Sequence, residues 1–205
     1  YGVGFGIYQD LLYHYGQSNS GIGSFNSNYT IPGGDAPTGR WDHYAHVRSG
    51  DKFLLYMNGV LRGVTGQSTS SGLETYSGKL RFGDAAYIAN EGHVGYYDEI
   101  RASKVARYGN IDIPTGLISS SQNAGPGLNP ISPEHVKLLI QSNSTMTTSD
   151  SIIDRSGHNT ISATSVTVSQ GKTNFGNTSF LFGSGDAYLS YTSDGSDHIG
   201  KEDFS

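Results

Sequence analysis

The chain has 205 residues, a net charge of -5 and no cysteine, so one large β domain or two small ones fit its length. Its 13 basic residues are scattered, which excludes a Lys/Arg stripe for a row of phosphates, and we expect no nucleic-acid partner. No apolar run approaches the roughly 20 residues of a membrane-spanning helix, so we expect no membrane insertion.

Short apolar or alternating runs follow one another from residue 3 to residue 113, separated by Gly, Asn, Asp or Ser. A spacing of about ten residues between such runs is typical of antiparallel sandwiches and barrels. The expected strands lie at residues 3–9, 11–16, 41–47, 52–57, 59–64, 79–83, 86–89 and 92–102. The pattern therefore predicts an all-β fold.

Residues 39–60, "GRWDHYAHVRSGDKFLLYMNGV", predict a meander: a strand, a tight turn, a return strand and an Asn58-Gly59 turn. Because side chains alternate along a strand, two sets of residues face opposite ways. We expect the first set to point inward: Trp41, His43, Ala45 and Val47. The second set should face away from the core: Asp42, Tyr44, His46 and Arg48.

Residues 116–133, "GLISSSQNAGPGLNPISP", have almost no apolar periodicity and are predicted to be a linker. Strand patterns resume after it, in "HVKLLIQS", "TISATSVTVS", "SFLFG" and "AYLSY", with turns at "DRSGHN" and "GSGD". The chain starts at Tyr1 and stops at "GKEDFS", where apolar and turn residues indicate the start of an element, so we expect it to be part of a longer polypeptide.

Two blocks of motifs resemble laminin-G-like members of the concanavalin-A-like lectin/glucanase superfamily. The later part of that family is similar to the Trp-x-His strand, the Tyr-x-Asn-Gly hairpin, "GYYDEIR" and "VARYGNIDIP" before residue 115. Its earlier part is similar to "VKLLIQSN", "DRSGHN", "KTNFG" and "GSGDAYL" after residue 134. The order of the blocks is thus reversed with respect to the family.

This resemblance implies a two-sheet antiparallel jelly-roll sandwich. It makes residues 1–115 the C-terminal half of one repeat, residues 116–133 the linker, and residues 134–205 the N-terminal half of the next repeat. A half-sandwich alone would expose open strand edges and an apolar face. We therefore expect residues 134–205 to complete a sandwich with residues 1–115, permuted within one chain or strand-swapped with a neighbouring copy.

The resemblance further implies a setting and a possible metal. Tandem modules of this kind occur in bacteriophage tail fibres and other phage structural proteins and in bacterial surface proteins, so we expect an extracellular or virion-surface location. Related jelly rolls hold a structural Ca²⁺ through an Asp on the last long strand, and Asp98 stands at that position. Asn143 stands where an acid of the first strand is usual, and oxygen-rich turns suit this ion.

The aromatic pattern offers a carbohydrate-binding site. Tyr13 and Tyr15 are two residues apart on one expected strand, and Tyr8 precedes them on its neighbour, so all three could line one face and stack on sugar rings. The alternative is that these tyrosines pair across strands only to stabilise the sheet.

Catalysis is not expected. Glycoside hydrolysis with retention needs two carboxyl groups about 5–5.5 Å apart in one cleft. Asp98 and Glu99 are adjacent on a strand and face opposite ways, and the histidines are scattered without metal-ligand or triad spacing. We interpret the chain as a non-catalytic carbohydrate-binding or adhesion module of a larger virion or cell-surface protein. A purely structural fibre or capsid-decoration module stays open as the alternative, and a glycoside hydrolase is the third choice.

Overall fold

The computed structural model describes residues 3–8, 11–16, 25–30, 38–49, 52–66, 79–83, 92–106, 133–142 and 152–192. Apart from one short 3-10 helix, η1 (Pro133–His135), the regular elements within these residues are β-strands. Every strand pair in them is antiparallel. The predicted all-β antiparallel fold is therefore confirmed. None of the described elements is a helix long and apolar enough to cross a membrane.

The strands before residue 107 agree with the apolar runs, except that β3 (Phe25–Thr30) is added and the expected run at residues 92–102 forms two strands, since Glu99 between them has a positive φ of 59°. They are β1 (Val3–Tyr8), β2 (Leu11–Gly16), β3 (Phe25–Thr30), β4 (Tyr44–Ser49), β5 (Lys52–Met57), β6 (Val60–Gly66), β7 (Lys79–Phe82), β8 (Gly95–Tyr97) and β9 (Ile100–Ser103). The sequence "FNSNYT" of β3 was not expected to be a strand, because Asn and Ser are poor strand formers. The expected run at residues 86–89 and linker residues 116–132 lie outside the described residues.

The strands after residue 133 follow the second set of predicted runs. They are β10 (Val136–Ile140), β11 (Ser162–Thr164), β12 (Val166–Ser169), β13 (Ser179–Phe182) and β14 (Tyr188–Thr192). The run "TISATSVTVS" forms two strands in place of one, because Ser165 between them has a positive φ of 52°. That conformation turns the chain, so β11 and β12 join different sheets.

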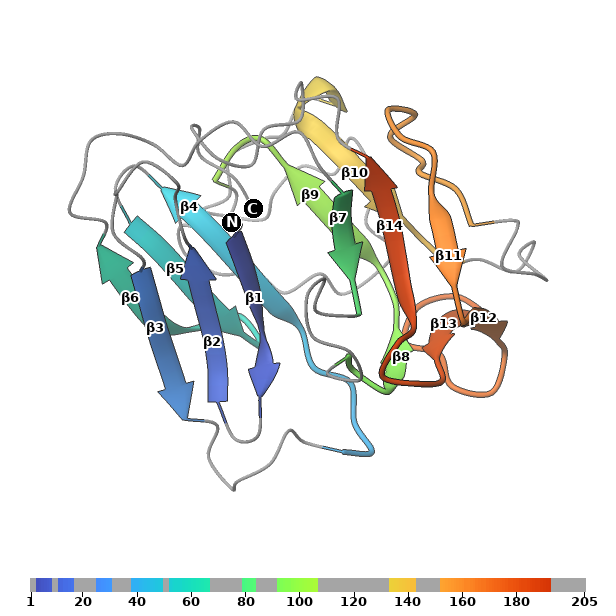
Figure 1. The fold of residues 1–205 in the computed structure, drawn as a ribbon, viewed down its shortest axis with the longest axis horizontal. Helices are drawn as coiled ribbons and strands as arrows, with labels where there is room; N and C mark the ends of the chain where they lie inside the picture. Colours follow the sequence, from blue (N-terminus) through green and yellow to red (C-terminus); the bar gives the residue numbers. More distant parts are fainter. Residues whose placement is uncertain are drawn as a thin grey trace.

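Strand pairing joins the part of the chain before the expected linker to the part after it. β9 pairs with β10, β8 pairs with β13, and β7 pairs with β14. The resulting sheet orders are β10-β9, β12-β13-β8 and β11-β14-β7 (Figure 1). Residues 133–192 are thus interleaved with residues 79–106 in the same chain. The open edges that a half-sandwich would leave are paired here within one molecule.

The core between these sheets also draws on both parts of the chain. Ile100 and Ala102 come from β9, and they pack with buried residues of β10 and β12–β14. The cluster comprises Ile100, Ala102, Leu138, Ile140, Ile152, Val166, Phe180, Phe182, Ala187, Leu189 and Tyr191. Burying one phenylalanine or leucine side chain stabilises a fold by about 1.5–3 kcal/mol, so this shared core holds the two parts together.

The remaining strands form two further sheets, β1-β2-β3 and β4-β5-β6. β3 contacts β6 and β2 contacts β5, so one sheet lies over the other, with β1–β3 in front in Figure 1. These layers, together with the interleaved sheets, give the two-layer arrangement of a sandwich.

The hairpin of β4 and β5 forms where it was predicted, but its burial differs from the prediction. Ala45 and Val47 are buried as expected, while Trp41 precedes the strand and is only half-buried. His46 and Arg48 were expected to face away from the core, yet both are buried. His46 stacks on the Phe53 ring, with ring centroids 5.7 Å apart, and the Arg48 guanidinium lies 5.9 Å from the same ring. Both faces of this hairpin are therefore covered.

Candidate functional site

The three tyrosines singled out in the sequence occupy one face of the sheet β1-β2-β3, as judged from strand register. Tyr8 is directly opposite Leu11, which has the same parity on β2 as Tyr13 and Tyr15. Directly opposed residues of an antiparallel pair share a face, and so do residues two apart on one strand. The positions of Tyr8, Tyr13 and Tyr15 therefore lie on the same side of the sheet. We call this side the tyrosine face.

Glycine flanks the central tyrosines on one side, and amide residues flank them on the other. Gly6 is opposite Tyr13 and Gly4 is opposite Tyr15 on β1. On β3, Asn28 is opposite Tyr13 and Asn26 is opposite Tyr15. The tyrosine face thus combines aromatic positions, positions without a side chain, and positions with amide groups.

The other side of the same sheet has an apolar composition. Its positions, as given by the same register, include Val3, Phe5, Ile7, Leu12 and Phe25. An antiparallel sheet commonly packs its apolar face on the core and leaves its mixed face to solvent. The composition of the two sides therefore predicts that the tyrosine face is the solvent side.

A surface of this composition suits a saccharide. Aromatic rings can cover the C–H face of a pyranose, and each asparagine amide supplies two donors and one acceptor oxygen for sugar hydroxyls. On β1, the glycines opposite Tyr13 and Tyr15 place no side chain beside those positions.

Asp98 lies between β8 and β9 and joins three segments through its carboxylate. Ser142 Oγ donates a hydrogen bond to Asp98 Oδ1 over 2.6 Å, and the Phe175 amide donates to Oδ2 over 2.9 Å. The backbone amides of Asn174 and Glu99 also donate to this carboxylate. Burial raises the pKa of Asp98, and these hydrogen bonds oppose that rise. Asp98 therefore fixes residues 174–175 and Ser142 to the end of β8.

The calcium ligand expected at Asp98 stays a prediction. Backbone N–H groups and the Ser142 hydroxyl face the carboxylate, and Ca²⁺ would bind through its oxygens. Asn143, the second expected ligand, lies outside the described residues. In the described part of the chain no three His, Asp or Glu side chains are grouped as metal ligands.

The turn at "DRSGHN" is organised by a second carboxylate. Asp154 is buried, and its oxygens accept hydrogen bonds from the backbone amides of Leu139, Ser156 and Asn159. The Asn159 side chain also donates to the Lys137 carbonyl on β10. This predicted turn is confirmed, and its polar residues are used to hold the loop against β10.

The sequence did not predict a depression in the loop between β12 and β13, although the resemblance placed the "KTNFG" loop there. Gln170, Thr173, Gly176 and Asn177 line a shallow depression of about 480 Å³. The depression lies beside the residues that bind Asp98, since Phe175 belongs to the same loop. Single polar loop residues carry no periodic signal, so only the contacts reveal this feature.

Comparison with known proteins agrees with this architecture. The family described as the concanavalin A-like lectin/glucanases superfamily, of laminin G type, matches residues 5–109, about half of the chain. The chain belongs to this superfamily. No curated protein and no solved structure shows a significant match.

Proposed function

We propose that the chain is a non-catalytic carbohydrate-binding or adhesion module of a larger virion or cell-surface protein, and that it works at an extracellular or virion surface. The superfamily often binds carbohydrates or serves adhesion. The observation that carries the proposal is the register that puts Tyr8, Tyr13 and Tyr15 on one face.

The ligand we propose is a neutral glycan. Tyrosine and asparagine at neighbouring positions recognise C–H faces and hydroxyl groups and need no charge on the sugar. The net charge of -5 disfavours the approach of polyanionic glycans.

A non-catalytic role is supported by the positions of the two acids that the sequence singled out. The Asp98 carboxylate binds Ser142 and Phe175, while Glu99 Oε2 accepts a hydrogen bond from Gln141 over 2.7 Å. Both acids thus bind protein groups of different neighbouring residues, which suits a structural role for each.

A purely structural module is the second candidate. The interleaving of residues 79–106 with residues 133–192 favours it, since pairing of this kind could also link one module to the next. The two candidates differ in a single measurable property, which is binding of a free glycan.

The test is a glycan array followed by titration calorimetry on the whole chain and two variants. The double variant Tyr13→Ala/Tyr15→Ala removes two aromatic contacts of about 0.5–1.5 kcal/mol each, so we expect roughly tenfold weaker binding or more. Tyr96→Ala is the matched control, because Tyr96 is 37% exposed and lies on β8 in a different sheet. No binding by the unaltered chain would favour the structural module, and equal binding by all three proteins would contradict a site on the tyrosine face.

A further inference from the structure

The turn between β5 and β6 contains the single Asn-Gly dipeptide of the sequence. Asn58 and Gly59 both adopt positive φ, 51° and 74°, as a two-residue type I′ hairpin turn requires. The same dipeptide is chemically labile, because glycine has no side chain to hinder attack on the preceding asparagine.

The reaction is deamidation. The backbone nitrogen of Gly59 gives up its proton and attacks Cγ of Asn58, and a nitrogen–carbon bond forms. The bond from Cγ to Nδ2 breaks, and the side-chain nitrogen leaves as ammonia with the proton. Water then opens the five-membered imide, leaving aspartate or isoaspartate at position 58. The reaction needs only water, and it requires the Asn58 carboxamide to turn toward Gly59.

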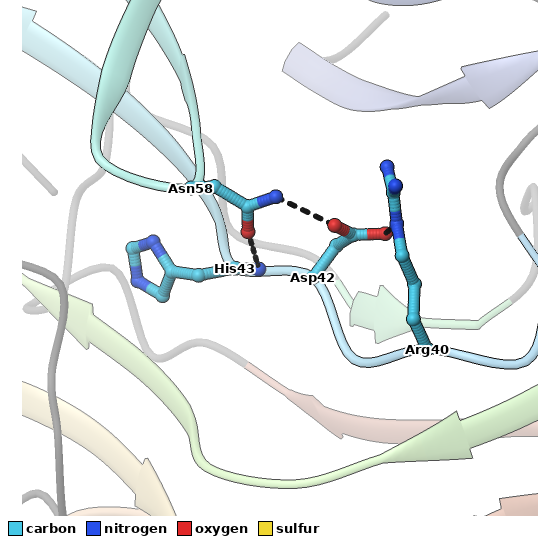
Figure 2. Close-up of polar contacts among 4 residues, drawn as sticks. All are labelled: Arg40, Asp42, His43 and Asn58. Carbon is cyan, nitrogen blue, oxygen red and sulfur yellow. Dashed lines mark hydrogen bonds and ion pairs between the residues drawn. The ribbon is translucent and has the colours of Figure 1, made fainter. Parts of the chain in front are cut away.

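The Asn58 side chain is held at both of its polar atoms (Figure 2). Nδ2 donates to Asp42 Oδ1 over 2.6 Å, and Oδ1 accepts from the His43 amide over 2.8 Å. The backbone N–H of Asn58 donates to the backbone carbonyl of His43 over 2.8 Å. This hydrogen bond extends the β4-β5 ladder by one residue pair.

Asp42 is itself fixed in place. Its Oδ2 pairs with Arg40 Nε at 3.0 Å, and its side chain is only 5% exposed. In Figure 2, Asp42 lies between Asn58 and Arg40. The His43 imidazole points away from Asp42 and Arg40. The Asp42 carboxylate also affects Tyr44. Burial makes the larger contribution and the Asp42 charge the next, and together they raise the pKa of Tyr44 to about 12.

We propose that Asp42 and the His43 backbone form a clamp that protects Asn58 from deamidation. Both hydrogen bonds must break before Cγ can reach the Gly59 nitrogen, which slows the reaction roughly 5- to 30-fold relative to the unfolded chain. Asp42 acts here as a positioning residue.

The clamp has a consequence for the reaction product. Aspartate at position 58 would place a carboxylate where Nδ2 now contacts Asp42 Oδ1 at 2.6 Å. Like charges at this distance repel as long as both groups are ionised. The loss of stability caused by deamidation is therefore largest when both carboxylates are ionised, and it becomes smaller as the pH falls.

The first experiment measures deamidation by peptide mass spectrometry at pH 8.5 and 37 °C. It compares the unaltered chain, folded and in urea, with Asp42→Ala and Asp42→Asn. We expect Asp42→Ala to react several-fold faster than the unaltered chain, and Asp42→Asn to stay slow because its amide oxygen still accepts from Asn58. Circular dichroism verifies that each variant is folded. Equal rates for folded Asp42→Ala and the unaltered chain, or for folded and urea-treated chain, would overturn the proposal.

The second experiment measures thermal unfolding of Asn58→Asp, which mimics the product. We expect a lower Tm at pH 7 that recovers toward the unaltered value at pH 4. The double variant Asp42→Asn/Asn58→Asp should recover at pH 7, since an amide again faces a carboxylate. An Asn58→Asp variant as stable as the unaltered chain at pH 7 would contradict the clamp.

Discussion

Asp98 shows how one residue connects distant parts of this chain. Ser142 and Phe175 lie 44 and 77 residues away along the sequence, and both donate to its carboxylate. Ser142 Oγ lies within 2.6 Å of the Thr178 carbonyl as well, so the network reaches the start of β13. Ser142 is fully buried, and a buried donor is costly to leave without an acceptor.

Replacing Asp98 by alanine should therefore destabilise the fold. The donors from Ser142, Phe175 and their neighbours would lose a charged acceptor, and we expect a loss of about 2–4 kcal/mol in the free energy of unfolding by urea denaturation. Arg155→Ala, which removes an exposed charge in the "DRSGHN" turn, is the control and should change stability by about 0.5 kcal/mol or less.

The effect of calcium on the Tm distinguishes the two roles considered for Asp98, which are hydrogen-bond acceptor and calcium ligand. If the carboxylate serves as a hydrogen-bond acceptor, millimolar CaCl₂ leaves the Tm of the unaltered chain unchanged. A calcium-dependent rise in Tm that disappears in Asp98→Ala would contradict this role and support the metal site expected from the resemblance.

At the scale of elements, glycines let backbone segments approach each other where β7, β8 and the turn before β14 meet. The Gly92 amide donates to the Gly185 carbonyl over 2.9 Å, and the His93 amide donates to the Gly83 carbonyl over 2.7 Å. A Cβ at position 92 would lie 2.2 Å from the Gly185 oxygen, which no real contact allows.

Gly92→Ala should therefore force these segments apart. We expect a loss of about 1–3 kcal/mol in the free energy of unfolding, the usual cost of overpacking. Gly183→Ala provides a matched control, because a Cβ there meets nothing within 4 Å. A Gly92→Ala variant as stable as Gly183→Ala would show that the described approach of these segments is wrong.

The sequence predicted most of the elements because their period-two patterns are strong. β5 and the Asn58-Gly59 turn form at the expected residues. β3 was missed because the Asn and Ser residues of "FNSNYT" separate its strand-forming Phe, Tyr and Thr, and pairing with β2 makes it a strand. The tyrosine positions could be proposed from the sequence, but the opposed Gly4, Gly6, Asn26 and Asn28 needed the strand register. Burial of His46 and Arg48 depends on what covers the hairpin, which alternation cannot tell.

At the scale of the whole molecule, the sequence predicted two incomplete sets of strands that need each other. It could not tell whether the second set pairs with its own chain or with a neighbouring copy. Alternation of apolar and polar residues indicates which side of a strand faces the core, but it does not identify the strand with which it pairs. The structure pairs them within one chain, at β7–β14, β8–β13 and β9–β10. Their assignment to two successive repeats, and the linker at residues 116–133, stay predictions.

The most direct test of this arrangement is a disulfide between the two parts of the chain. Tyr96 on β8 is directly opposite Leu181 on β13, and the natural sequence has no cysteine to interfere. Cα atoms of opposed residues lie about 4.5–5.5 Å apart, which a disulfide can span, whereas two strand spacings cannot be bridged. Tyr96→Cys/Thr167→Cys is the control, because Thr167 lies one strand beyond Leu181.

After mild oxidation, non-reducing electrophoresis and mass spectrometry show where the disulfide forms. The account predicts that Tyr96→Cys/Leu181→Cys becomes a crosslinked monomer, while the control keeps free thiols. Crosslinked dimers in its place, or no crosslink at all, would contradict a sandwich completed within one chain.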